Sequence, residues 1–435
     1  MESHAVQLAL ALRPERTLIR RGGSFRHIDV QLSVAPAPGN TVVGRAPLRL
    51  ALVLDRSGSM QGAKLHTAKR AVMAVLERLE ERDEAALVVF NDRVQVVQPM
   101  APVTGALRTA VQAALAEIEA RSNTALHEGW LTGCQAIIDE YDPTNAHHLA
   151  RCFLLTDGLA NVGVTDPEQI ASEAAGIRAH TGIGTSTFGV GEDYNELLLG
   201  PLAVAGGGQF HHLRTADEIT TTFLGELGDL LAVAARRVRL ELEVDAGLMV
   251  DLTSAYWAQP VSQDTSHWII DIGDLLSGEE RHVVVRLGFP AQAAQEGHSV
   301  RARLLWLADD CEQSGDWQEV RFLYSDQQAC DAEVRDPSVM HWVGLHQADR
   351  AHREAIRRSQ SGDLSGAREQ LREVSGHISR YAGEDEELHT TMTDLRQLEE
   401  QLSDASLPSS TSKELWYQQQ TRSRGQKDYR QSDSQ

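Results

Sequence analysis

The stretch LALVLDRSGSMQGAK, residues 50–64, joins an apolar run to a turn that is rich in hydroxyl groups. A continuous apolar run is typical of a parallel strand that is covered on both faces of its sheet. The run ends at Asp55, and Ser57 and Ser59 follow at alternate positions. An acid beside two hydroxyls at a buried strand end indicates one of three features: a phosphate-binding loop, a nucleophile turn or a metal site.

The first two kinds of site do not fit the spacing. A phosphate-binding loop needs Gly, four residues and then Gly-Lys-Ser/Thr. Here one residue too few separates the glycines, Ala63 stands between Gly62 and Lys64, and no hydroxyl follows the lysine. A nucleophile elbow needs Gly-x-Ser-x-Gly, and neither Ser57 nor Ser59 has glycines at both positions. The sequence therefore favours the metal site.

Two further segments supply the oxygen ligands that a hard divalent cation prefers. RSNTALHEG places Thr124 at the start of an expected helix, and LLTDGLANVG ends a second apolar strand at Asp157. The carboxyl ends of parallel strands meet at one edge of a sheet, so these loops should converge there. The predicted ligands are Asp55, Ser57, Ser59, Thr124 and Asp157.

The pattern of apolar and polar residues changes several times along the chain. Residues 48–235 alternate apolar strands with helical patterns, which predicts six strands and interleaved helices in an open, doubly wound, mostly parallel α/β sheet of the Rossmann-like type. Residues 1–47 and 236–330 contain short alternating segments typical of an antiparallel β-sandwich. Because the first strands have no other partners, we expect the α/β domain to be inserted into one discontinuous sandwich. Residues 337–405 read as a helical hairpin or bundle, and 406–435 as a disordered tail.

The five predicted ligands resemble those of von Willebrand factor A (VWA) domains. The metal-ion-dependent adhesion site (MIDAS) of that family has the pattern Asp-x-Ser-x-Ser, then a distant Thr and a distant Asp, and the five residues match it in order and type. VVFND, LLTDGLANVGVTDPEQI, TFGVGEDYNE and AGGGQFHHL are similar to forms common in bacterial members. The resemblance covers residues 48–235. The flanking strands and helices are similar in layout to bacterial and inter-alpha-inhibitor-like relatives.

The resemblance implies a binding device. Three hydroxyls and two carboxylates leave Mg²⁺, or alternatively Mn²⁺ or Ca²⁺, short of one ligand, which an Asp or Glu of a protein partner supplies. No acids follow the motif, so we expect one metal. His127 and Glu128 could be considered as a base for metal-assisted hydrolysis, but we assign them to the exposed first turn of a helix and expect no enzymatic activity.

Three functional interpretations follow. The first is a scaffold that binds a partner through the metal, and such partners include an AAA+ ATPase or components of signalling or defence assemblies. The alternative is a regulatory subunit of an AAA+ ATPase or chelatase-type complex. The third is a cell-surface adhesin, which the absence of a basic leader before AVQLALALRP disfavours; we expect a cytoplasmic protein. With 41 basic and 62 acidic residues the net charge is −21, which disfavours nucleic acid and membrane as partners.

Other residues receive structural interpretations. The pairs His147–His148 and His211–His212 invite a zinc site, but neighbours on a strand point to opposite faces. A disulfide between Cys311 and Cys330 is an alternative to four reduced cysteines, of which we expect Cys134 and Cys152 to fill the core. Four tryptophans are assigned to the sandwich core or, alternatively, to a recognition surface: Trp257, Trp268, Trp306 and Trp317.

Overall fold

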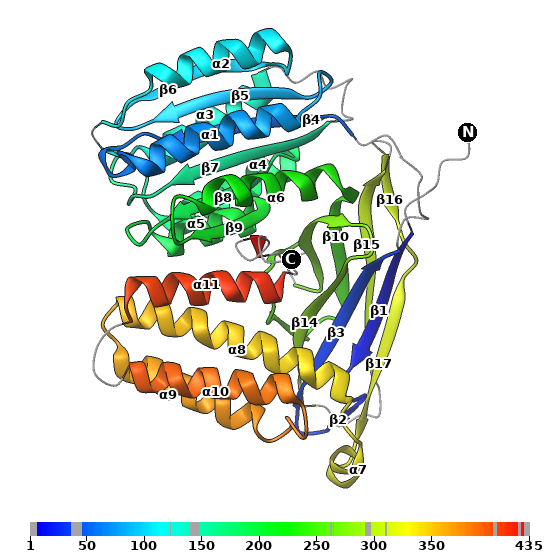
Figure 1. Ribbon diagram of the computed structural model, residues 1–435. Helices are drawn as coiled ribbons and strands as arrows, with labels where there is room; N and C mark the ends of the chain where they lie inside the picture. Colours follow the sequence, from blue (N-terminus) through cyan, green and yellow to red (C-terminus); the bar gives the residue numbers. More distant parts are fainter. Residues whose placement is uncertain are drawn as a thin grey trace. The chain divides into compact units, whose positions relative to one another are not determined.

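A computed structural model describes most of the chain, in two compact units (Figure 1). The first, the α/β unit, comprises Pro38–Arg236 with Lys427–Gln435, and the second, the β unit, comprises Met1–Ala37 with Arg237–Gln426. The described residues are 7–35, 46–121, 123–139, 148–261, 263, 265–291, 297–308, 311–402, 407–424 and 428–429.

The α/β unit contains a six-stranded sheet in the order β6-β5-β4-β7-β8-β9, which confirms the predicted fold class. All neighbouring strands are parallel except β5 and β6. The strands are β4 (Leu48–Asp55), β5 (Glu84–Phe90), β6 (Val94–Pro102), β7 (Leu149–Thr156), β8 (Gly184–Val190) and β9 (Gly207–Leu213). The helices are η1 (Gly58–Met60), α1 (Ala63–Arg78), α2 (Gly105–Glu117), α3 (Leu126–Asp139), α4 (Pro167–Thr181), α5 (Glu196–Ala205) and α6 (Glu218–Leu231).

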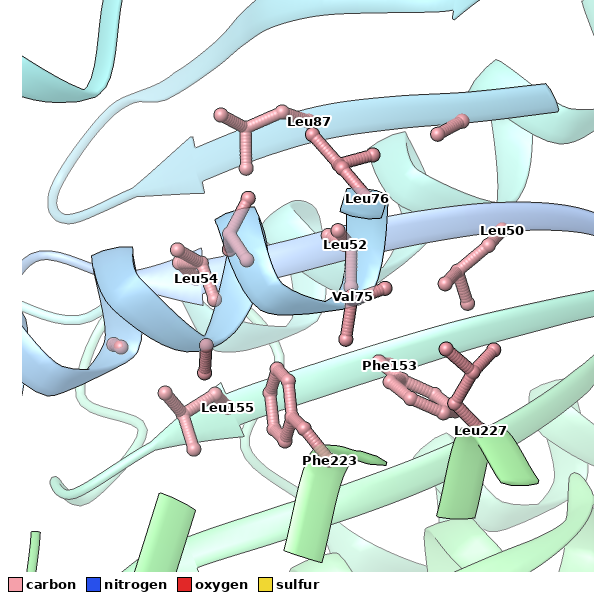
Figure 2. Packing of buried hydrophobic residues seen from close by; sticks show 14 of the residues in the cluster. Leu50, Leu52, Leu54, Val75, Leu76, Leu87, Phe153, Leu155, Phe223 and Leu227 are labelled. Atoms are coloured by element: carbon pink, nitrogen blue, oxygen red, sulfur yellow. The ribbon is translucent and has the colours of Figure 1, made fainter. Parts of the chain in front are cut away.

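Strand β4 lies in the middle of this sheet, and each of its residues is buried. Its side chains alternate between the two faces, as a strand requires. Figure 2 shows Leu50, Leu52 and Leu54 packed with apolar residues of α1, α6 and the neighbouring strands. Helix α3 covers the opposite face, where a β-carbon on Gly133 would clash with Val53. The glycine lets α3 approach the sheet closely, which fixes the loop before that helix.

Two antiparallel sheets form the β unit, and the N-terminal strands join both. One has the order β1-β3-β14-β11, and the other β12-β13-β10-β15-β17-β2 with β16 beside β15. The α/β unit is thus inserted between strands of one discontinuous sandwich, as predicted. One departure is that β2 pairs with β17 in parallel. The strands are β1 (Leu8–Pro14), β2 (Leu18–Arg20), β3 (Ser24–Val34), β10 (Val233–Val244), β11 (Met249–Leu252), β12 (Trp257–Pro260), β13 (His267–Leu276), β14 (Glu280–Phe289), β15 (His298–Ala308), β16 (Cys311–Ser314) and β17 (Gln318–Ser325).

Helices complete the β unit. They are α7 (Gln327–Ala332), α8 (Pro337–Gln360), α9 (Leu364–Ile378), α10 (Glu386–Gln401) and α11 (Ser409–Ser423). The turn between α8 and α9 contains Gly362 at φ 83°, and the side chain of Asp363 caps α9 by accepting from the N–H of Gly366. The described part of the chain contains no helix that is both long and apolar enough to cross a membrane.

The predicted disordered tail needs a correction, because residues 409–423 form α11. Trp416 and Tyr417 are buried, and Leu415 packs against the core formed by α8, α9 and α10. Three consecutive apolar residues in a polar segment therefore supply enough burial to order it. Of the rest of the predicted tail, 406, 425–427 and 430–435 lie outside the described residues.

The prediction that the tryptophans fill the sandwich core is also wrong. Trp257, Trp268, Trp306 and Trp317 are all half-buried. Trp317, for example, lies beneath the guanidinium groups of Arg301 and Arg303, whose carbons are 4.9 and 4.5 Å from its ring centroid. Cys134 and Cys152 are buried as expected. The thiols of Cys311 and Cys330 are free, so the alternative disulfide is absent.

Candidate metal centre

Asp55 ends β4 with its side chain completely buried. One carboxylate oxygen accepts the backbone N–H of Ser57 at 2.7 Å, and the other accepts the hydroxyl of Thr156 at 2.5 Å. Burial raises the pKa of Asp55 to about 6, although these hydrogen bonds act in the opposite direction. The carboxylate is therefore held in a fixed orientation at the carboxyl edge of the sheet.

Ser59 lies on the short turn η1, and Ser57 is the residue that precedes this turn as its N-cap. Met60 is fully buried and anchors this turn, and the hydroxyls of Ser57 and Ser59 lie 3.1 Å apart. Ser59 also donates to Asp157, the residue that directly follows the neighbouring strand β7, at 2.6 Å. The Ser59–Asp157 hydrogen bond therefore joins the first loop to the end of the next strand.

Thr124 reaches the same place from the loop before α3. Its backbone N–H donates to the side chain of Asn161 at 2.9 Å, and the N–H of Asn161 donates back to its carbonyl at 3.2 Å. A β-carbon on Gly158 would lie 3.3 Å from the hydroxyl oxygen of Ser59, 3.5 Å from that of Thr124 and 3.9 Å from that of Ser57. The three predicted hydroxyls therefore face one point beside Gly158, next to Asp157.

Backbone hydrogen bonds tie the three loops together. The N–H of Arg56 donates to Phe90 at the end of β5, and the N–H of Arg121 donates to the carbonyl of Arg56, both at 2.8 Å. The side chain of Asn91 donates to the carbonyl of Arg121 at 3.2 Å, and its carbonyl accepts from Ala125 at 2.6 Å. A surface cavity of about 400 Å³ opens beside these loops, between the start of α1 and residues 119–120.

Four further residues of this site are not among those predicted from the sequence: Lys64, Asn91, Thr156 and Asn161. Lys64 extends from the first turn of α1 and forms a hydrogen-bonded ion pair with Asp157. Thr156 orients Asp55, while Asn91 and Asn161 hold the loop that carries Thr124. Asn91 and Thr156 stand at the ends of apolar strands, as Asp55 does, and that position is the signal that could have identified them.

The chemistry of the donor set fits a hard divalent cation. Two carboxylates and three hydroxyls offer oxygen alone, which suits Mg²⁺, Mn²⁺ or Ca²⁺ better than zinc. His127 is half-buried and not exposed as predicted; it bonds Glu173 at 2.7 Å, whereas Glu128 is exposed. The site's oxygens can therefore hold a cation and present it to an incoming oxygen ligand.

The rings of the described pair, His211 and His212, do not converge on a common point. His211 bonds Glu226 at 3.1 Å and His212 bonds Tyr194 at 2.7 Å, so the two rings have different partners, as expected for strand neighbours. His147 of the other pair lies outside the described residues.

A second cluster with metal-ligand chemistry lies in the β unit. Glu241 and Glu243 on β10 and His267 on β13 bring ligand atoms within 4.8 Å of one another. Arg303 and Arg301 already pair with the two acids, at 2.5 and 2.6 Å. This cluster was not predicted from the sequence.

With this geometry in place, comparison with known proteins assigns the domain. Residues 50–224 match the model of the von Willebrand factor type A domain family. The α/β unit of this chain is a VWA domain. VWA domains mediate protein–protein interactions and commonly bind a divalent metal.

Similar proteins come from several kingdoms. Uncharacterized protein sll0103 of Synechocystis is 27% identical over 56% of this chain and 57% of its own length. The E3 ubiquitin-protein ligase WAV3 of Arabidopsis thaliana is 26% identical over 66% of this chain and 38% of its own length. The chain thus spans about half or less of these curated relatives. The solved structure of a von Willebrand factor type A protein from Catenulispora acidiphila has a TM-score of 0.70 at 18% identity, covering 90% of this chain and 91% of that one. This last similarity shows the fold alone.

Proposed function

We propose that this chain is a non-enzymatic protein-binding module that binds an acidic residue of a partner through a divalent cation. Asp55, Ser57, Ser59, Thr124 and Asp157 hold the cation, and Mg²⁺ is the proposed physiological ion, with Mn²⁺ and Ca²⁺ as the alternatives. The observation that carries the proposal is the convergence of three hydroxyls beside Gly158, with Asp157 bonded to one of them.

The charge balance of this ligand set explains why the partner offers a carboxylate. Asp55 and Asp157 bring at most two negative charges, and Lys64 is already paired with one of them. A cation held mainly by neutral hydroxyls keeps a strong affinity for a further anionic oxygen. The cavity beside the loops gives the neighbouring residues of the partner room to dock.

The surroundings of the site favour binding over catalysis. Metal-assisted hydrolysis needs a base placed against a metal-bound water. His127, which stands near Thr124 in sequence, instead bonds Glu173. The ligase activity in the name of the Arabidopsis relative belongs to that protein, of which this chain matches 38%.

The proposed setting is the cytoplasm, where the four free cysteines fit a reducing compartment. The proposed partners there are an AAA+ ATPase or components of signalling or defence assemblies. Nucleic acid and membranes are not proposed as partners because the net charge of the chain is −21.

A pull-down from cell extract, with the full chain as bait, tests the proposal. It is performed in Mg²⁺, in a chelator, and in Mg²⁺ with the Ser57→Ala variant, and captured proteins are identified by mass spectrometry. We expect a set of proteins that is retained in Mg²⁺ and lost in both other arms. Retention of the same proteins in all three arms would separate binding from the metal and contradict the proposal.

A further inference from the structure

The carboxylate of Asp157 is already engaged by two donors of this chain. The residue is fully buried, and its oxygens accept from the ammonium of Lys64 and, at 2.6 Å, from the hydroxyl of Ser59. Leaving a buried carboxylate without a partner is costly, so the lysine stabilises the folded chain at this point. A divalent cation needs lone pairs of the same carboxylate.

The place of Lys64 on its helix makes this contact exchangeable. The residue lies in the first turn of α1, where the helix dipole disfavours a positive charge. The ion pair with Asp157 is therefore the main interaction that stabilises the ammonium at this position. Its side chain keeps 28% of its surface exposed, which leaves a path to solvent. A β-carbon on Gly191 would lie 3.7 Å from the lysine Nζ and 3.9 Å from its Cε, so the end of the lysine side chain lies beside the Gly191 backbone.

We infer that Lys64 is an internal counter-ion of Asp157, which leaves that carboxylate when a divalent cation binds. This inference rests on the proposed metal site and adds its regulation, because cation binding becomes an exchange of one positive group for another. The exchange weakens the intrinsic affinity for the metal. It also releases an ammonium at the edge where an acidic partner docks, so that metal loading and partner binding favour each other.

Lys69 provides a matched control on the same helix. It lies five residues after Lys64, carries the same charge, and donates to the backbone carbonyl of Ile118 instead of to a predicted ligand. Replacing either lysine by methionine removes one positive charge from α1, but only Lys64→Met frees an oxygen of Asp157.

Calorimetric titration with MgCl₂ measures the exchange in these variants. We expect Lys64→Met to bind Mg²⁺ about tenfold more tightly than the wild type, within the usual range of coupled binding. Lys69→Met should stay within about twofold of the wild type, because its ammonium bonds the carbonyl of Ile118 and the long-range effect of losing one charge is largely screened. Lys64→Arg keeps the cation and should also stay close to the wild type.

Acylation of lysines on the wild-type chain tests the movement without any variant. The protein is treated briefly with acetic anhydride in chelator or in saturating Mg²⁺, and modification of each lysine is quantified by mass spectrometry. We expect Mg²⁺ to increase the modification of Lys64 several-fold and to leave Lys69 unchanged.

The outcomes separate this inference from the proposed function. If the wild type bound no Mg²⁺, the metal site itself would be wrong and the inference with it. If Mg²⁺ bound but neither Lys64 acylation nor the affinity of Lys64→Met changed, the site would stand and the counter-ion role would be overturned. Tighter binding by Lys64→Met together with increased acylation supports both.

Discussion

Two clusters of acidic side chains, one in each unit, differ in what surrounds their carboxylates. At the edge of the VWA sheet, Asp55 and Asp157 stand beside hydroxyls at the ends of β4 and β7. On the face of the β unit, Glu241 and Glu243 lie within strand β10 beside His267. Both clusters could be read from a list of residue types as candidate metal sites.

Their neighbours distinguish them. Arg303 and Arg301 neutralise the acids of the β unit through direct ion pairs, and both guanidinium groups stack over Trp317. At the VWA edge the hydroxyls add lone pairs without adding charge, and the half-buried Lys64 pairs with Asp157. The comparison teaches that acids beside hydroxyls keep oxygens available for a cation, whereas acids beside arginines form a structural ion-pair network.

The largest difference between the clusters should appear on removal of one carboxylate from each. Asp157→Asn preserves size but removes a charged ligand, so we expect Mg²⁺ affinity to fall by about 100-fold or more. Glu243→Gln should leave it within about twofold. Calorimetric titration of both variants measures the contrast, and an equal loss in the two would break the comparison.

The pH dependence of stability gives a second contrast. Burial raises the pKa of Asp55 to about 6, while Arg303 and His267 hold the pKa of Glu241 below its ordinary value against the effect of burial. Between about pH 4 and 6 the folded chain keeps the Asp55 proton that the unfolded chain releases, so in chelator this group lowers the free energy of unfolding as pH rises, by about 1–3 kcal/mol.

Urea unfolding of the wild type and Asp55→Asn in chelator, at steps from pH 4 to pH 7, measures this effect. The variant should lose the downward slope over that window. The depressed pKa of Glu241 has the opposite sign: its contribution is present above the pKa of the unfolded chain and is lost as pH falls through the lower, folded value. An unchanged slope in Asp55→Asn would show that another group dominates.

A β-carbon added at Gly158, beside the hydroxyls of the proposed metal site, should have a moderate effect on Mg²⁺ affinity. Gly158→Ala brings carbon to 3.3 Å from the hydroxyl oxygen of Ser59, so we expect roughly a tenfold loss of Mg²⁺ affinity with the fold retained. Gly176→Ala on α4 meets nothing within 4 Å and serves as the control, with unchanged affinity and equal or higher stability. Equal affinities in the two variants would place the cation elsewhere.

The smallest effect is expected on the free energy of unfolding, from a substitution in the β unit. Arg303→Met removes a pair in which the arginine side chain is 30% exposed and the Glu241 side chain 9% exposed. We expect a loss of about 1 kcal/mol in the free energy of unfolding, measured with urea, and no change in Mg²⁺ affinity. Gain of Mg²⁺ binding on this substitution would mean that the arginine alone keeps a second site closed.

Local patterns were enough to predict the edge of the VWA sheet. One apolar run is followed by Asp55 and a second by Asp157. Each run predicts a buried strand, and each acid marks the position at which that strand ends. Parallel strands then bring those ends together by geometry, so the five candidate ligands could be named before their contacts were known.

The remaining features depend on contacts between distant segments. The sequence places Lys64 in a helix but does not show that it reaches Asp157, 93 residues away. The polar average composition of the tail did not predict α11, where Leu415 packs against other helices of the unit and Trp416 and Tyr417 are buried. The assignment of Trp317 to the core failed because stacking on arginines satisfies an aromatic ring at the surface as well.

Anomalous diffraction from crystals grown with Mn²⁺ tests the central claim most directly, because the signal locates the cation without reference to activity. We predict one strong peak at the edge of the VWA sheet, within coordination distance of Asp157, Ser57 and Ser59. A peak beside Glu241 and His267, or ordered Mn²⁺ at neither cluster at saturating concentration, would contradict the account.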